Sequence, residues 1–464
     1  MTFDTVIMNS HVVLPNGIVD KNIIIDEGKI FGLTNDIPQC DTKINANGLV
    51  ALPGLIDPHV HYGVYSPIEQ AALTESKVAA MGGITTMMRM LRLSGSYKKN
   101  LDSHLSASAQ SHYVDYSIHA SILHEGQIDE MDFCTKKGIT SFKLYMNLGD
   151  EVGHVYMDMQ PGDKSLHEEK VEINTKIVEK VITKASELRC TVLVHAEDYQ
   201  MCSCGIREAR SKNKNGLAAW SESRSVESEV KSITTASQIA KKTGCKLYFV
   251  HIGSQAAMDS ISKERKNGTK IFVETCPHYL TLSYESQQGF LAKVMPPIRS
   301  SKDKDRIWNA VQDGKIDSIG TDHVANRLDL KLGGSTVWDA LAGFPGMGTM
   351  LPILLSEGVN KGKITLQQLA NLTSTNTAKI FGMYPNKGII QKGSDADIVL
   401  ADLKQEKKVS SELLDGFSDY NVYEGWVMKG WPVKTLVRGS IVSEDLKIIQ
   451  KPGYGKFISR PTSS

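Results

Sequence analysis

The stretch Leu52-Pro-Gly-Leu-Ile-Asp57-Pro-His59-Val-His61 marks the point where the character of the sequence changes. An apolar run leads directly into two histidines. Side chains two residues apart on a strand lie on the same face, so both imidazoles can point at one ion. Two unrelated surface histidines would give the same short motif, so the pair alone is a weak signal. Its meaning depends on the rest of the chain.

The sequence on either side of this stretch predicts two kinds of structure. Residues 1–54 consist of short apolar runs separated by turns, which is typical of a small β domain. Residues 55–384 alternate apolar runs with longer amphipathic stretches, as in a parallel barrel, and residues 385–464 return to strands and turns. We therefore predict an α/β fold: a (β/α)8 TIM barrel over residues 55–384, and a small β-sandwich domain formed by residues 1–54 together with residues 385–464.

Individual elements of the barrel are also predicted. Residues 228–242 have the apolar spacing of an amphipathic helix. Residues 198–225 are hydrophilic, and we expect an exposed loop or lid there. The apolar runs predicted as barrel strands are residues 85–88, 117–120, 141–145, 191–194, 246–250, 270–273 and 316–319.

Composition excludes several classes of protein. The 464 residues carry 53 Lys and Arg against 52 Asp and Glu, a formal net charge of +1. A chain without a net field is not expected to bind nucleic acid or an anionic membrane, so we predict a small-molecule partner. The seven Cys are scattered and lack the paired spacing of a zinc ribbon or a disulfide framework. With no signal-peptide pattern and no apolar run of about 18 residues, we predict a cytoplasmic protein.

Polar side chains end several of the apolar runs. His195 closes one run, His251 closes another, and Asp322 follows a third. In a parallel barrel the carboxyl ends of the strands meet at one mouth, so these side chains are expected to converge with the His59 and His61 pair. Each histidine taken alone fits a satisfied core position. Together they match the imidazole and carboxylate set preferred by zinc and similar divalent ions.

Lys143 lies inside the apolar run of residues 141–145. An outward-facing or snorkelling lysine is the simplest interpretation of such a position. A buried lysine has a second use, because desolvation lowers its pKa and the neutral amine can add CO2. The resulting carbamate is an anionic ligand that can bridge two cations about 3.5–4 Å apart.

Together these motifs closely resemble those of the cyclic amidohydrolases, a family that includes hydantoinase, dihydropyrimidinase, allantoinase and dihydroorotase. The likeness covers nearly the whole chain. The motifs that carry it are His59-Val-His61, Phe142-Lys143, Val194-His195-Ala-Glu, Val250-His251, Glu274-Thr-Cys-Pro-His-Tyr-Leu, Pro296-Pro-Ile-Arg and Thr321-Asp322-His323.

The resemblance implies a hydrolase of a five- or six-membered cyclic amide with two divalent metal ions, zinc or alternatively manganese, and a CO2-derived carbamate on Lys143. Asp322 would act as general base and then as general acid. The family likeness also suggests a homo-oligomer, either dimer or tetramer. The implied ligands are His59, His61 and Asp322 for one ion, His195 and His251 for the other, and Lys143 between them.

Departures from the family pattern bear on the substrate. Dihydroorotases have an arginine two residues after the histidine pair that grips a carboxylate, whereas this chain has Gly63. Hydantoinases have a tyrosine five residues after the bridging lysine that supports the oxyanion, whereas this chain has Leu148. Tyr145, Tyr156 and His154 are the nearby candidates for that role, and the metals alone are the alternative.

Two further positions are implied to contact the substrate ring through their backbones. Met295 stands where family members often have Ser or Asn, and Ala342 where hydantoinases often have Asn. Backbone contacts survive such replacements. We therefore favour a hydantoinase or dihydropyrimidinase type of activity over allantoinase, and allantoinase over dihydroorotase. A non-enzymatic scaffold of the same fold is disfavoured by the intact ligand set, and a deaminase would usually use one metal and no carbamate.

Overall fold

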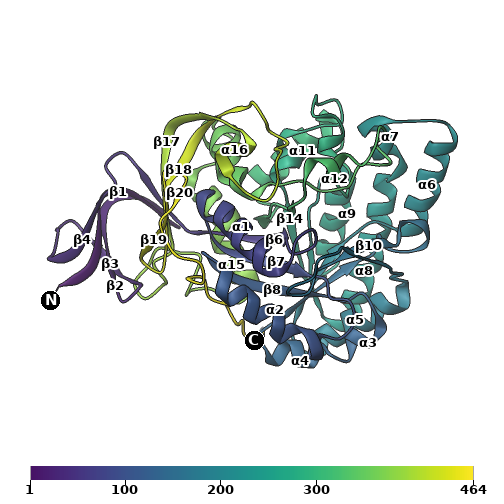
Figure 1. Ribbon diagram of the computed structural model, residues 1–464, viewed down its shortest axis with the longest axis horizontal. Helices are drawn as coiled ribbons and strands as arrows, with labels where there is room; N and C mark the ends of the chain where they lie inside the picture. Colours follow the sequence, from purple (N-terminus) through teal and green to yellow (C-terminus); the bar gives the residue numbers. More distant parts are fainter. Residues whose placement is uncertain (1, 463–464) are drawn as a thin grey trace.

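The computed structural model describes residues 2–462 and consists of a parallel barrel with a β domain at its side (Figure 1). Seven barrel strands pair in the order β14-β13-β12-β9-β8-β7-β6. The eighth place is shared, because β15 pairs with β14 and β16 pairs with β6, both in parallel. All seven predicted runs lie in or overlap these strands. The barrel strands are β6 (Leu55–His61), β7 (Ile84–Leu91), β8 (Asp115–Ser121), β9 (Ser141–Tyr145), β12 (Thr191–His195), β13 (Lys246–Phe249), β14 (Ile271–Thr275), β15 (Ser318–Ile319) and β16 (His323–Val324).

Helices alternate with the barrel strands and pack outside them (Figure 1). The predicted helix over residues 228–242 lies within α8. Within residues 2–462, no helix has the length and apolar character needed to cross a bilayer. The helices between barrel strands are α1 (Ile68–Met81), α2 (Tyr97–Ser111), α3 (Glu125–Ile128), α4 (Met131–Lys136), α5 (Thr175–Glu187), α6 (Tyr199–Ser211), α7 (Gly216–Ser223), α8 (Val226–Thr243), α9 (Gln255–Lys266), α10 (Pro277–Thr281) and α11 (Ser301–Gln312).

Smaller elements complete the chain. A two-stranded hairpin, β10 (His154–Met157) with β11 (His167–Lys170), is inserted after β9. Turns of π-helix occupy Leu354–Val359 and Asn371–Thr375, and 3-10 turns occupy Asp150–Val152, Gly289–Ala292 and Met347–Thr349. The short helices after β16 are α12 (Leu328–Leu332), α13 (Met350–Ile353), α14 (Leu366–Ala370), α15 (Asn376–Ile380) and α16 (Ser411–Leu414).

The expectation of an exposed loop over residues 198–225 was wrong, because this segment forms α6 and α7. The alternative of a lid stays a prediction. Each helix has its own start signal: the Asp198 side chain accepts a hydrogen bond from the Met201 amide at 3.0 Å, and the Asn215 side chain accepts one from the Gly216 amide at 2.8 Å. The polar composition reflects outward faces, while Trp220 is buried. The polar composition of this segment resembles that of a loop, so composition alone does not identify its helices.

Both chain ends meet in one β domain, as predicted. The strands β5 and β17 pair antiparallel, which joins the N-terminal strands to the C-terminal ones. The strand β1 spans two of the short runs seen in the sequence, with a register shift where Asn9 takes a positive φ of 60°. The domain strands are β1 (Phe3–Leu14), β2 (Gly17–Asp26), β3 (Lys29–Thr34), β4 (Cys40–Asn45), β5 (Val50–Pro53), β17 (Ile398–Lys408), β18 (Val427–Val437), β19 (Ser440–Glu444) and β20 (Lys447–Ile448).

An isoleucine-rich core fills this β domain, with Ile7, Ile23, Ile398 and Leu436 among its buried members. The chain passes from this domain to the barrel between β5 and β6. We keep the boundaries at residues 54/55 and 384/385 as a proposal that is compatible with this arrangement.

Candidate metal centre

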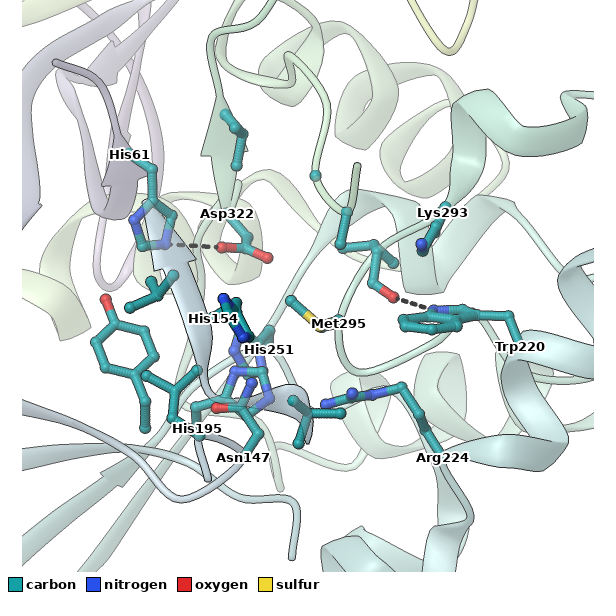
Figure 2. Close-up of a pocket in the computed structure, with 18 of the residues that line it drawn as sticks. His61, Asn147, His154, His195, Trp220, Arg224, His251, Lys293, Met295 and Asp322 are labelled. Atoms are coloured by element: carbon teal, nitrogen blue, oxygen red, sulfur yellow. Dashed lines mark hydrogen bonds and ion pairs between the residues drawn. The ribbon is translucent and has the colours of Figure 1, made fainter. Parts of the chain in front are cut away.

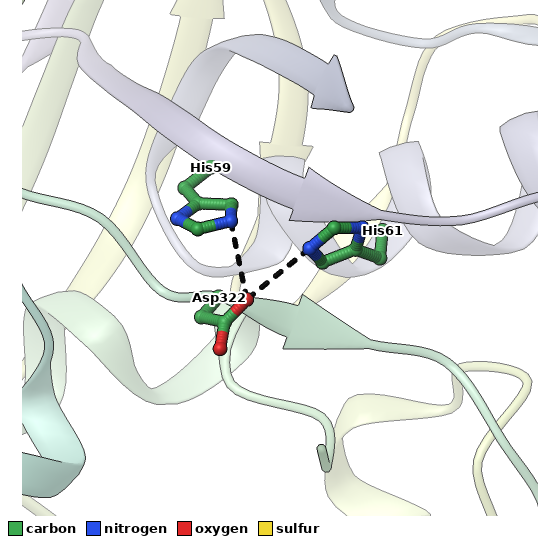
Figure 3. Close-up of side chains that lie close together, drawn as sticks. All are labelled: His59, His61 and Asp322. Carbon is green, nitrogen blue, oxygen red and sulfur yellow. Dashed lines mark ion pairs between the residues drawn. The ribbon is translucent and has the colours of Figure 1, made fainter. Parts of the chain in front are cut away.

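The carboxyl end of β6 brings His59 and His61 to the carboxylate of Asp322, which lies between β15 and β16 (Figure 3). Asp322 Oδ1 is 3.2 Å from His59 Nε2 and 3.3 Å from His61 Nε2. The ligand atoms of these three buried side chains lie within 4.8 Å of one another, close enough to hold one metal ion. The alternation predicted for the histidine pair is therefore realised on one strand face.

His195, His251 and Lys143 stand next to this group, and all three are buried. The imidazole centroids of His195 and His251 are 4.5 Å apart, and those of His59 and His251 are 5.2 Å apart. Lys143 Nζ and His251 Nδ1 are buried with no hydrogen-bond partner among residues 2–462. Buried polar atoms without partners are costly, so this arrangement fits side chains that take a ligand.

Carboxylates behind the histidines fix the ring orientations. His59 Nδ1 lies 2.8 Å from Glu274 Oε1, and His195 Nε2 lies 2.6 Å from Glu197 Oε2. The Arg224 guanidinium donates two hydrogen bonds to the same Glu197 carboxylate, at 2.9 Å and 2.6 Å. Such carboxylate–histidine pairs set which ring nitrogen is left for a metal.

Electrostatics favours uncharged nitrogen ligands here. Burial lowers the pKa of His59, His61 and His251 well below the ordinary histidine value. Burial also lowers the pKa of Lys143 to about 7, so a large share of its amine is unprotonated near neutral pH. Both shifts remove protons from the nitrogen atoms that must donate an electron pair.

Two of the six predicted ligands have an unusual backbone. His251 has φ of 44° and Asp322 has φ of 50°, both in the left-handed region that side-chain-bearing residues rarely adopt. Such strain is kept where the surrounding structure enforces it, and it gathers at functional sites. The residue before Asp322 is held in place by a second carboxylate. Asp57 accepts hydrogen bonds from both the amide and the hydroxyl of Thr321, at 3.0 Å and 2.5 Å.

These six side chains line a cavity of about 400 Å³. Figure 2 shows four of them, His61, His195, His251 and Asp322, around this cavity. Met295 and Ala342, predicted to touch the substrate, both line it. Leu148 lines it as well, which places an apolar side chain where a hydrogen-bond donor was sought. The structure therefore brings the six predicted ligands and both predicted substrate contacts to one pocket.

The three candidate replacements for that donor differ in position. Tyr145 lines the cavity two residues after Lys143, its hydroxyl is 3.5 Å from Ser121 Oγ, and burial raises its pKa to about 12, so it stays protonated. His154 also lines the cavity, from the hairpin β10. Tyr156 packs edge-on against Tyr65, with centroids 5.6 Å apart.

A second acidic cluster, formed by Asp115, Asp395 and Asp397, is not a metal site of the same kind. The ammonium group of Lys387 stands among the three carboxylates at 2.7, 3.2 and 2.6 Å respectively. The Lys387 ammonium thus supplies the positive charge that a metal ion would otherwise bring to these carboxylates.

Several pocket residues were missed by sequence reasoning: Arg92, Trp220, Arg224 and Lys293. A signal existed for Arg92, because it directly follows the apolar run of β7, as the predicted ligands follow theirs. The other three come from a helix, its C-terminal end and a loop, and their spacing in the sequence carries no such pattern.

Comparison with known proteins agrees with this geometry. The model of the amidohydrolase family matches residues 50–442. The chain belongs to the amidohydrolase family. It is a hydrolase of the cyclic amidohydrolase kind, as predicted, and the scaffold alternative is not supported.

Relatives within this amidohydrolase family match end to end. The L-hydantoinase of Paenarthrobacter aurescens is 28% identical, over 99% of this chain and 98% of that protein. The D-hydantoinase of Geobacillus stearothermophilus is 30% identical, over 98% and 96%. The crystal structure of dihydropyrimidinase from Brevibacillus agri superposes with a TM-score of 0.89 at 28% identity, covering 99% of both chains.

Proposed function

We propose that this protein hydrolyses the C–N amide bond of a five- or six-membered cyclic amide or ureide, of the hydantoin or dihydropyrimidine type. The observation that carries the proposal is that six buried ligand-type side chains, two from β6 and the others from or next to four further barrel strands, line one cavity. Relatives named hydantoinase and dihydropyrimidinase match over nearly the whole chain. The proposal concerns a small-molecule substrate in a cytoplasmic, homo-oligomeric enzyme, either dimer or tetramer.

We infer a centre of two divalent ions, zinc or alternatively manganese. The donor set supports this, because His59, His61 and Asp322 form one group while His195 and His251 form another with 4.5 Å between ring centroids. The chemistry that two such ions would supply when bound is a hydroxide at neutral pH and polarisation of the substrate carbonyl.

Lys143 is proposed to lie between the two groups as a carbamate. Its neutral amine attacks CO2, an N–C bond forms, and one proton is released, which leaves an anionic carboxylate on the side chain. Burial supports this step, because a pKa of about 7 makes the free amine available. Lys143→Ala is expected to lower bound metal from about two ions per chain, and unchanged metal content with full activity would contradict the carbamate.

The remaining steps belong to the protein. Met295 and Ala342 are proposed to hold the ring by backbone groups at one side of the cavity. Asp322 is proposed to take the proton released during attack on the amide carbon and to pass it to the leaving nitrogen. Its Oδ1 faces the two histidines and its other oxygen points away from them, so one carboxylate can serve both tasks (Figure 3).

A panel of rings tests the proposed function. Purified protein with measured metal content is assayed by ring-opening absorbance on hydantoin, dihydrouracil, allantoin and succinimide, with added zinc or manganese. We expect turnover on hydantoin or dihydrouracil above that on allantoin. Metal near one ion per chain together with deamination, or no ring opening with any compound, would reject the proposal.

A further inference from the structure

Arg92 stands at the mouth of the barrel next to the candidate metal centre. It immediately follows β7, which pairs in parallel with β6, the strand that carries His59 and His61. Val60 lies opposite Arg89 in that pairing, so Arg92 comes just beyond the level of the histidine pair. Its side chain lines the same cavity as His61 and Lys143.

Within residues 2–462, no carboxylate lies close enough to the Arg92 guanidinium to form an ion pair with it, although its charge acts on the nearby Asp158 carboxylate. The neighbouring carboxylate, Asp158, gives its ion pair to Arg89 Nη2 at 2.8 Å and meets Arg92 only through the backbone amide, at 3.1 Å. The Arg92 Nε is buried and has no hydrogen-bond partner. A half-buried arginine with an orphaned donor is costly unless a ligand completes it.

The carboxylates that share this cavity are engaged elsewhere. Glu151 lies 3.2 Å from Arg207, and Asp322 faces His59 and His61. Neither carboxylate that lines the cavity is therefore free to pair with Arg92, which leaves its guanidinium available to an anionic ligand.

Of the other basic side chains that line the cavity, Lys143 belongs to the candidate metal centre and Arg224 is paired with Glu197. The remaining two are less suited to that anion. Lys293 Nζ lies 4.2 Å from the centroid of the Trp220 ring and donates a hydrogen bond to the Ala340 carbonyl. Figure 2 shows Lys293 and Trp220 close together, on the side of the cavity away from His61. Arg210 is exposed, so water solvates it.

We propose that Arg92 binds a carboxylate carried on the ring substituent of the substrate, so that this enzyme prefers cyclic amides with an acidic side chain. The inference rests on the proposed function, because it assigns the substituent of the same ring. A planar guanidinium matches a carboxylate through two parallel N–H donors, which gives direction as well as charge. Arg92 is thus a specificity residue, while proton transfer and metal binding lie with other side chains.

A matched substrate pair tests the proposal on the metal-loaded enzyme. Hydantoin-5-acetic acid and 5-isobutylhydantoin have substituents of the same branching and size, and differ in charge. We expect Arg92→Met to lower kcat/KM for the acid by about ten- to a hundredfold, mainly through KM, and to change the isobutyl compound by less than about threefold. Arg92→Lys should retain part of the preference, and Arg306→Met, which removes an exposed guanidinium on α11, should leave both unchanged.

Ionic strength gives a readout that does not need a variant. For wild-type enzyme, KM for the acid should rise with salt while KM for the isobutyl compound stays level, because screening weakens only the charged contact. Equal losses of kcat/KM on both substrates in Arg92→Met would mean that Arg92 acts on the ring or on the reaction itself. Loss of the acid preference in Lys293→Met but not in Arg92→Met would mean that Lys293 binds the carboxylate. Either result overturns the proposal. If 5-isobutylhydantoin is turned over and the acid is not preferred, only the role of Arg92 is rejected. If neither ring is opened, the proposed function is rejected.

Discussion

At the scale of single residues, Asp322 is given two tasks that a substitution can separate. Asparagine keeps the size of the side chain and an oxygen that can face His59 and His61, but it cannot accept a proton at neutral pH. We expect Asp322→Asn to lower kcat by about 10²–10⁴, the range for general acid–base catalysis, with a smaller change in metal content. Steady-state kinetics with metal analysis on the same sample checks this. Normal turnover at normal metal content would assign the proton transfer to another group.

Glu197 acts on the site through His195. Burial alone would raise the pKa of Glu197, but Arg224 lowers it to about 2, so the carboxylate is ionised throughout the neutral range and accepts from the imidazole. We expect Glu197→Gln to weaken metal affinity by about 10–100-fold, because the ring loses the partner that orients it. Competition with a metal-binding dye measures the affinity. The exposed Glu227 offers a control, and an equal loss in Glu227→Gln would show a non-specific effect of charge.

Single-residue features were predictable where chemistry and position coincide in the sequence. His195 ends an apolar run and Asp322 closely follows one, so barrel topology alone places them at the mouth. The carboxylate behind His59 was not predictable in the same way, since Glu274 lies 215 positions away and its partner is chosen by the packing of two distant strands. Arg92 is left without an ion pair because Asp158 forms its ion pair with Arg89 instead, and this pairing depends on how the folded chain packs.

At the scale of elements, the loops around Met295 and Ala342 are held by buried lysines. Lys331 Nζ donates to the carbonyls of Lys293, Leu341 and Gly343, at 2.9, 2.6 and 2.8 Å. One side chain thus ties together both pocket segments whose backbones are proposed to meet the substrate. This role was not predictable from the sequence, because a lysine is rarely fully buried.

Lys293, in the first of these loops, makes stability depend on pH. Burial lowers its pKa to about 7 from an ordinary value of 10.5, so between these values the unfolded chain holds a proton that the folded chain lacks. Stability from this group therefore rises with pH over that window and is lost as pH falls toward 7. From pH 9 to pH 7, wild type should lose about 2 kcal/mol relative to Lys293→Met. Urea unfolding at both pH values measures the difference, and a pH-independent gap would contradict the depressed pKa.

The helices α6 and α7 show why the expectation of an exposed loop failed. Periodicity identifies a helix when one face is continuously apolar, as in α8. In α6 the buried positions include Cys202, Ser203 and Ala209, which are small or polar and raise no apolar signal. The sequence signal for α6 was its N-cap residue Asp198, which is hard to recognise in a stretch rich in polar residues.

At the scale of the whole molecule, one buried charge cluster joins the barrel to the β domain. Lys387 contacts Asp115, the first residue of β8, and Asp397, which directly precedes β17. Arg438 pairs with the same Asp115 and donates to the Tyr454 carbonyl at 2.7 Å, which brings in the C-terminal tail. The tail continues along the barrel, where the Arg460 amide donates a hydrogen bond to the Gly138 carbonyl.

The cluster lies at the amino end of β8, whereas the candidate metal ligands lie at carboxyl ends, so stability and catalysis can be separated. Lys387→Met leaves the buried carboxylates of Asp115 and Asp397 with less compensation, and breaking one partner of a buried ion pair costs about 3–5 kcal/mol. We expect a large fall in Tm by calorimetry with nearly unchanged kcat at moderate temperature. Lys29 pairs with Asp395 at 2.5 Å but its side chain is 47% exposed, so Lys29→Met should cost at most about 1 kcal/mol. Equal, small changes in Tm for both variants would mean that Asp115 is balanced by Arg438 alone and that the two domains are held by their apolar contacts.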